Sequence, residues 1–291
     1  MTRGAWWLWL GLVFLVASVG GAALGLSWLA QNVTPLGWTG VILIADGLLA
    51  RRGASWLVRY PRELLWAAVI SVPSWLLFEF YNRPRFWREN GPELWWHYHG
   101  LPPWPERGIG YLWAFATITP AVLLIAQLIQ GHLAKLPRGK GGKVPEEVAV
   151  VLLLVGFPLA VLPLLWPSPY FAADVWLAWP LLLEGVNYLR GKPCLLRDFE
   201  QGDRSRFVAL LAAGAVCGFI WEALNWVASA RWVYTVPFAG QVKLFEMPVL
   251  GYFGFLPFAV AVFNLWVLLR SLIPWPPLAW QPQPGERPPA G

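Results

Sequence analysis

The strongest constraint on the fold of this chain is a run of about 20 mostly apolar residues that recurs about eight times between short polar segments. An α-helix of that length crosses the hydrocarbon core of a bilayer, which is about 30 Å thick. Charged residues make up only 13% of the 291 residues, whereas they make up about 25% of a soluble domain. We therefore predict an all-α, polytopic membrane protein with about eight transmembrane helices.

The apolar runs fall into two halves. Residues 1–131 and residues 148–273 each hold four predicted spans, and a basic linker over residues 132–147 joins them. Residues 274–291 are rich in proline, which predicts a disordered tail. The first run is longer than the apolar core of a secretory signal, so we interpret it as a span, with cleavage as the alternative. The predicted spans are 1–29, 36–50, 62–82, 109–130, 148–166, 170–189, 207–228 and 250–273.

The distribution of basic residues predicts the orientation of the chain. With the N-terminus inside, 16 of the 22 Lys and Arg residues lie in cytoplasmic segments, as the positive-inside rule requires. We predict a multi-pass protein of the inner (cytoplasmic) membrane with both termini in the cytoplasm. The net charge of +6 comes from these short loops, so it does not indicate nucleic-acid binding. The two cysteines imply no disulfide framework.

One motif occurs twice, at the ends of the third and seventh predicted spans. Each copy is a Glu-x-x-Asn followed by a Trp-x-Tyr, and both Glu and Asn recur at an offset of 143 residues. We interpret the chain as two parallel four-helix repeats. An even number of spans per repeat gives both copies the same orientation about an axis along the membrane normal. The motif residues are Glu79, Asn82, Trp96 and Tyr98 in the first copy and Glu222, Asn225, Trp232 and Tyr234 in the second.

The two glutamates are expected at the same depth. Each lies 16 residues into its span, about 24 Å along a helix, and a carboxylate inside a membrane usually faces a protein interior or a wet cavity. We predict an outward-facing cavity with Glu79, Glu222 and Glu246 as catalytic residues. Both asparagines and the two Trp-x-Tyr pairs are predicted to bind the substrate. Alternatively, each Glu-x-x-Asn caps the loop that follows it, or its Glu pairs with a neighbouring arginine.

Other polar residues have simpler interpretations. Asp46 and Glu184 follow apolar runs and precede arginines, which favours ion pairs at the membrane surface. His97 and His99 flank Tyr98 and are candidate metal ligands. The second copy of the motif has no histidine there, however, and we predict neither a metal nor a cofactor.

The combined pattern resembles a family of bacterial multi-span membrane proteins. That pattern has an acidic-Gly motif in the second span, Phe-Glu-x-x-Asn at the end of a span and then Trp-x-Tyr. Here it corresponds to Asp46-Gly47, to Phe78-Glu79 with Asn82, and to Trp96 with Tyr98. The resemblance implies no activity. A looser similarity, at the level of class only, is to the integral-membrane lycopene cyclases, which are also small, duplicated and dependent on acidic residues.

The sequence leaves several functions open. We favour an enzyme that acts on a membrane lipid or isoprenoid by acid–base chemistry, with Glu222 as general acid and Glu79 as its ionised partner. A transporter or channel that uses the paired Glu residues as cation or proton sites is the alternative. A structural membrane subunit is the third possibility, and the sequence does not predict an oligomeric state.

Overall fold

The computed structural model describes residues 5–83, 93–133, 137–237 and 242–274, and within these ranges the chain is built mainly from α-helices. Seven stretches of the described chain are long and apolar enough to cross a membrane. The all-α membrane fold predicted from the apolar runs is therefore confirmed. Helix α8 occupies the position of the remaining predicted span but is not among these seven. The predicted disordered tail lies almost wholly outside the described residues.

The helices are α1 Trp6–Ala23, α2 Ser27–Gln31, α3 Val33–Ala50, α4 Trp56–Arg59, α5 Pro61–Asn82, α6 Glu106–Leu133, α7 Glu146–Leu165, α8 Ala172–Leu189, α9 Leu195–Glu200, α10 Ser205–Val227 and α11 Phe255–Arg270. Two 3-10 helices, η1 Pro169–Phe171 and η2 Val249–Gly254, precede α8 and α11. The strands are β1 Trp96–His99, β2 Arg231–Tyr234, β3 Lys243–Leu244 and β4 Met247–Pro248.

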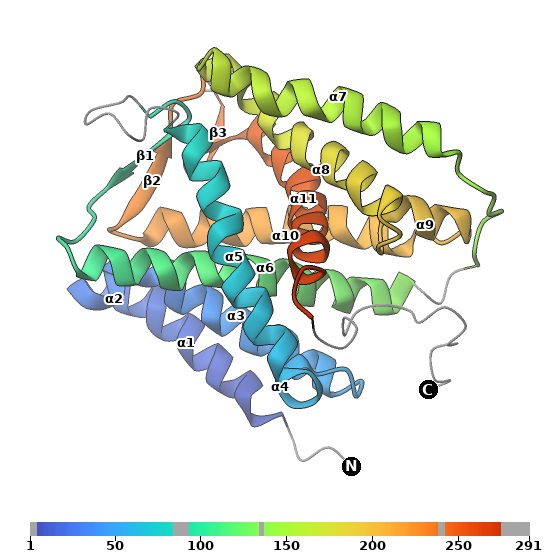
Figure 1. The fold of residues 1–291 in the computed structure, drawn as a ribbon. Helices are drawn as coiled ribbons and strands as arrows, with labels where there is room; N and C mark the ends of the chain where they lie inside the picture. Colours follow the sequence, from blue (N-terminus) through green and yellow to red (C-terminus); the bar gives the residue numbers. More distant parts are fainter. Residues whose placement is uncertain (1–4, 84–92, 134–136, 238–241, 275–291) are drawn as a thin grey trace.

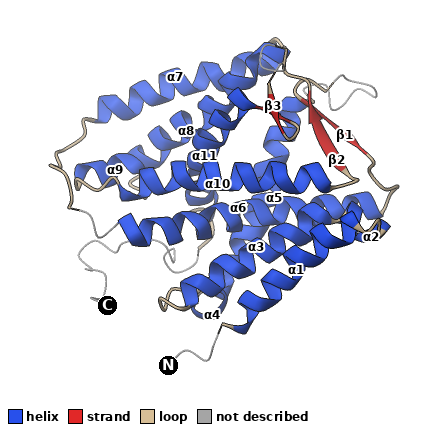
Figure 2. Cartoon of the chain, turned by 180° about the vertical axis from the view of Figure 1, so that it is seen from behind, coloured by secondary structure: helices blue, strands red, loops and turns tan. Residues whose placement is uncertain are grey.

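The long helices form one bundle, shown in Figure 1. Helix α6 lies at its centre and packs against α3, α5 and α10. Helix α11 packs against α8 and α10. Helices α1 and α7 lie on the outside, where α1 packs on α3 and α7 packs on α8. The strands β1 and β2 lie beside α2 at one end of the bundle, whereas α4 and α9 lie at the other end (Figures 1 and 2).

Small residues bring α10 and α11 together. A Cβ atom on Gly214 would collide with the backbone oxygen of Phe255, and one on Gly218 would collide with the ring of Phe255. Only glycine allows so close an approach of two helices. The sequence places both glycines on the helix face of Glu222, one and two turns before it, and the structure confirms that another helix packs there.

The predicted ion pair of Asp46 is wrong. Its carboxylate is 1% exposed and anchors the segment that begins α4. It accepts hydrogen bonds from Trp7 Nε1 at 3.1 Å, Ser55 Oγ at 2.7 Å, Trp56 N at 2.6 Å and Leu57 N at 3.1 Å. A carboxylate with four donors around it needs no cation to offset its burial.

Glu184 plays the same part at α9, so the arginine pairing expected for it is also wrong. One carboxylate oxygen accepts from the backbone N–H of Leu196 at 2.7 Å, and the other accepts from Asn264 Nδ2 at 3.1 Å. Each of these acidic residues thus holds the start of a short helix that follows a long one.

A buried ion pair joins α5 to α11. Arg270 donates to both carboxylate oxygens of Glu63, with Nε to Oε2 at 3.0 Å and Nη2 to Oε1 at 2.6 Å. Both residues are nearly inaccessible to solvent. The pair is bidentate, which is the geometry that best compensates two buried charges.

Candidate functional site

The two Trp-x-Tyr segments meet in a two-stranded ribbon. Strand β1 pairs antiparallel with β2, so that Trp96 lies opposite Tyr234 and Tyr98 lies opposite Trp232. Residues directly opposite each other share a face of a ribbon, as do residues two apart along a strand. All four aromatic side chains therefore project from the same face. The sequence placed these segments in two separate loops and carried no signal for their pairing.

Two buried asparagines hold this ribbon on the helices. Asn225 Nδ2 donates to the backbone oxygen of Trp232, and Asn225 Oδ1 accepts from the N–H of Trp232, each at 2.9 Å. Asn82 bonds in the same way to Trp96 O, at 2.9 Å, and its oxygen also accepts from the N–H groups of Trp95 and Trp96. Both asparagines are 0% exposed. Their predicted role as substrate-binding residues is therefore wrong, because their polar atoms bind backbone, as in the capping alternative.

The two glutamates of the motif do not cap the backbone. Glu79 Oε1 accepts from Tyr98 Oη at 2.5 Å and from Trp75 Nε1 at 2.9 Å. Glu222 Oε1 accepts from Tyr234 Oη at 2.8 Å. Glu222 is 0% exposed, and its Oε2 has no hydrogen-bond partner among the described residues. Each glutamate is thus bonded to the tyrosine of its own motif copy.

Both tyrosines remain protonated at ordinary pH. Burial raises the pKa of Tyr98 well above its usual range, and the nearby Glu79 raises it further. Burial and then Glu222 raise the pKa of Tyr234 in the same way. Because a hydroxyl both donates and accepts hydrogen bonds, each tyrosine can pass a proton between its glutamate and a group on its other side.

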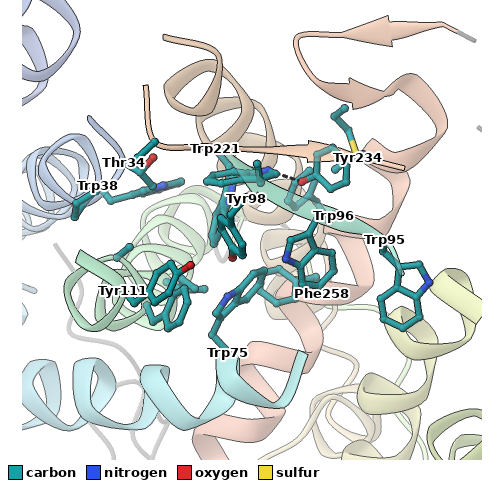
Figure 3. A pocket seen from close by; sticks show the side chains of 18 of the residues that line it. Thr34, Trp38, Trp75, Trp95, Trp96, Tyr98, Tyr111, Trp221, Tyr234 and Phe258 are labelled. Atoms are coloured by element: carbon teal, nitrogen blue, oxygen red, sulfur yellow. Dashed lines mark hydrogen bonds between the residues drawn. The ribbon is translucent and has the colours of Figure 1, made fainter. Parts of the chain in front are cut away.

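A cavity of about 560 Å³ lies under the ribbon. It falls in the range of about 300–1,000 Å³ that is usual for small-molecule sites. Tyr98 and Tyr234 form part of its wall, as do Trp96 and Trp232, but Glu79 and Glu222 do not. The glutamates lie one layer behind the wall and reach the cavity through their tyrosines. Figure 3 shows Tyr98 and Tyr234 among the aromatic side chains around this space.

Aromatic rings dominate the wall. Besides the four from the ribbon, the wall includes Trp28, Trp38, Trp75, Trp95, Tyr111, Trp113, Phe115, Trp176, Trp221, Phe253, Phe255 and Phe258. Trp75 contacts several of these rings, with its ring centroid 5.4 Å from that of Trp221 and 5.9 Å from that of Trp96 (Figure 3). Sequence reasoning did not assign Trp75 to the site. The available signal was its position four residues before Glu79, which places both on one helix face.

The other predicted site residues lie outside this arrangement. Glu246 is not part of the wall, and its carboxylate lies 3.7 Å from the guanidinium of Arg231. His97, on the other face of β1, lies with its Nδ1 2.7 Å from a carboxylate oxygen of Glu93. Glu93 also pairs with Arg83. Among the described residues no three His, Cys, Asp or Glu side chains come together in a group that could hold a metal ion.

The fold and site define a helical membrane protein with an aromatic cavity served by two Tyr–Glu pairs. Comparison of the chain with protein-family models, with curated proteins and with solved structures finds no match. Function is therefore inferred from the chemistry of the cavity itself.

Proposed function

We propose that this protein is a membrane-embedded enzyme that acts on a lipid or isoprenoid by acid–base chemistry in the aromatic cavity. The observation that carries the proposal is the pair of tyrosine hydroxyls in the cavity wall, each hydrogen-bonded to a carboxyl group on a spanning helix. An apolar wall binds a hydrocarbon chain, and the few polar groups placed in it select where the chemistry occurs.

The hydrogen bonds of the two glutamates support different roles. Glu79 accepts two hydrogen bonds on one oxygen, and such bonds stabilise an anion. Glu222 accepts one, and its second oxygen has no partner in the described part of the chain, which suits a protonated carboxyl. We propose that in the protonated state of Glu222 this hydrogen bond is reversed, so that a proton on Oε1 is donated to the Tyr234 oxygen and the Tyr234 O–H is free for the substrate. Glu222 then gives its proton to Tyr234 while Tyr234 gives its own to the substrate. Tyr98 then takes a proton from the substrate and passes its own to Glu79, so the substrate gains one proton and loses one. Exchange with water afterwards removes the proton from Glu79 and replaces the one on Glu222, which restores the starting state.

The cavity wall also bears on the transport alternative. Its side chains are mostly aromatic or aliphatic, its charged and amide side chains lie on one side only, and Glu79 and Glu222 lie behind tyrosines rather than in the open space. A hydrated cation needs polar groups along its path. The wall therefore supports the enzyme over a cation pathway.

Pairs of corresponding interactions support the proposed duplication. Asn82 and Asn225 clamp equivalent tryptophans. In the ribbon, His97 lies opposite Val233, and these are the middle residues of the two Trp-x-Tyr motifs. A two-fold axis through the ribbon requires that a residue lie opposite its equivalent in the other repeat. We propose that this axis relates two parallel four-helix repeats.

We further propose that the end of the bundle with α4 and α9 faces the cytoplasm, so that the cavity opens toward the outer face of the inner membrane. The exposed cations Arg51, Arg52 and Arg190 and the half-buried Lys192 lie at or just after the ends of α3 and α8, next to α4 and α9. The positive-inside rule places such residues in the cytoplasm.

Deuterium transfer from solvent tests the proposed activity whatever the chemical nature of the product. The purified protein in detergent is incubated in D₂O with prenyl alcohols, prenyl phosphates and polyenes, and each compound is examined by mass spectrometry. We expect deuterium in at least one compound with the wild type and none above background with Tyr234→Phe. Tyr81→Phe is the matched control, because Tyr81 donates to Ala160 O away from the cavity. Equal incorporation by wild type and Tyr234→Phe would refute the proposal.

A further inference from the structure

Apart from the ribbon tyrosines Tyr98 and Tyr234, the polar residues of the cavity wall gather on one side. The side built by α2, α3 and α6 contributes Gln31, Asn32, Thr34, Glu106 and Arg107. The side built by α8, η2 and α11 contributes only apolar residues, among them Trp176, Leu177, Phe253, Phe255 and Phe258. A cavity with one polar side and one apolar side fits a ligand that has a polar head and a hydrocarbon chain.

Helices α3 and α6 bring these polar residues to one level. Trp113 Nε1 donates to Thr39 Oγ1 at 2.9 Å, and Arg52 Nη1 donates to Leu128 O at 3.1 Å. The first two partners are 74 residues apart and the second two are 76 apart. Because this separation is nearly constant along α3 and α6, the two helices run side by side in the same direction and in a fixed register. That register places Arg107 beside the first turn of α3, which contains Thr34.

Several hydrogen-bond donors on this side have no partner among the described residues. The Thr34 hydroxyl and the Trp38 indole N–H are unpartnered, although the two residues are only 8% and 2% exposed. Figure 3 shows these two side chains next to each other on α3. Arg107 donates its Nε–H to Pro102 O at 3.0 Å, and neither terminal NH₂ group has a hydrogen bond in the described part of the chain. A buried donor without an acceptor destabilises the protein, so the Thr34 hydroxyl and the Trp38 indole N–H favour a ligand rich in acceptors. The half-buried Arg107 adds a positive charge to the same side.

We propose that this side of the cavity binds the phosphate group of a single-chain phosphorylated lipid, whose hydrocarbon chain lies against the aromatic wall. A guanidinium, a hydroxyl and an indole N–H all donate, and phosphate oxygens are the strong acceptors that match them. Glu106 is the one acidic residue among the described residues of the wall. It is exposed, so water and salt screen its charge. The cavity volume of about 560 Å³ suits one chain rather than two.

This inference rests on the proposed function, since it names the substrate class of the same cavity, but it is tested by binding alone. The probes are farnesyl phosphate, farnesol, lauryl phosphate, a two-chain phosphatidic acid and inorganic phosphate, each titrated into the full-length protein in detergent and followed by tryptophan fluorescence. We expect farnesyl phosphate to bind about tenfold or more tightly than farnesol, because charge-assisted hydrogen bonds are worth about 1.5–3 kcal/mol. Phosphatidic acid and inorganic phosphate should bind weakly.

Two variants test whether the phosphate group binds on this side of the cavity. Arg107→Gln and Thr34→Val should each remove most of the preference for farnesyl phosphate over farnesol and leave farnesol binding unchanged. Arg231→Gln is the matched control, because Arg231 lies on the same end of the protein but outside the wall. Lauryl phosphate that binds as tightly as farnesyl phosphate supports the phosphate site and widens the chain class to acyl chains. Tighter phosphatidic acid binding would refute the single-chain class.

Two results would overturn the phosphate site. One is equal affinity for farnesol and farnesyl phosphate, and the other is a preference that Arg107→Gln and Thr34→Val leave intact. The outcome is separable from that of the proposed function. Tight binding of the phosphate without deuterium transfer would contradict the enzyme alone. Deuterium transfer to a prenyl alcohol without any phosphate preference would contradict the phosphate site alone.

Discussion

Replacing Asn225 by alanine should destabilise the protein by more than the small size of the asparagine side chain suggests. The side chain is fully buried and makes two hydrogen bonds of 2.9 Å to the backbone of Trp232. The alanine variant leaves a buried N–H and a buried C=O without a partner. Each unsatisfied group costs about 1–3 kcal/mol, so we expect a loss of about 2–6 kcal/mol in the free energy of unfolding.

The two free cysteines provide the assay. Cys194 and Cys217 are both buried, so a thiol-reactive fluorescent dye reports unfolding in mixed micelles of dodecyl maltoside and dodecyl sulfate. Asn32→Ala is the control, because its single side-chain hydrogen bond, to Trp28 O, is exposed and should cost less than about 1 kcal/mol. A midpoint for Asn225→Ala equal to that of Asn32→Ala would show that the ribbon is not held by this clamp.

Three further predictions concern stability and orientation. Glu63→Gln breaks the buried pair with Arg270 and should lower the free energy of unfolding by about 3–5 kcal/mol in the same assay. Burial raises the pKa of Asp198 from 3.8 to about 6, so its contribution to stability is fully present below about pH 4 and is lost as the pH rises through 6. Asp198→Asn should therefore flatten the dependence of the unfolding free energy on pH between 4 and 6. An unchanged pH profile would contradict the raised pKa of Asp198. In intact cells, an impermeant thiol reagent should label His99→Cys but not Gly142→Cys, and the reverse pattern would reject the proposed orientation.

The sequence predicted the helical membrane fold because a helix in lipid requires a long apolar run, and such a run can be recognised from the order of the residues alone. It could not predict how the two loops meet. The pairing of β1 with β2 is a contact between residues about 136 positions apart, and no local pattern specifies it. The segments that form β1 and β2 are rich in aromatic residues and only four residues long, so the sequence did not predict them as strands.

The site was predicted in part. Repetition of Glu-x-x-Asn picked out four residues near the cavity, but residue type alone did not separate their roles. Asn82 and Asn225 bind backbone, whereas Glu79 and Glu222 bind tyrosine hydroxyls. Whether a buried polar side chain meets backbone or another side chain depends on the path of the chain after the helix. That path is a tertiary property, which is also why the capping role of Asp46 was missed.

The central claim is that Glu222 supplies a proton to a substrate through Tyr234, and Glu222→Gln tests it most directly. Glutamine keeps the shape and an oxygen that accepts from Tyr234, but it has no proton to give. Glu200→Gln is the matched control, because Glu200 lies in α9 at the opposite end of the bundle. The measurement is deuterium transfer from D₂O to the substrate, alongside the unfolding midpoint. We predict that Glu222→Gln abolishes transfer and unfolds no earlier than the wild type, whereas Glu200→Gln retains transfer. Transfer by Glu222→Gln at the wild-type rate would contradict the account.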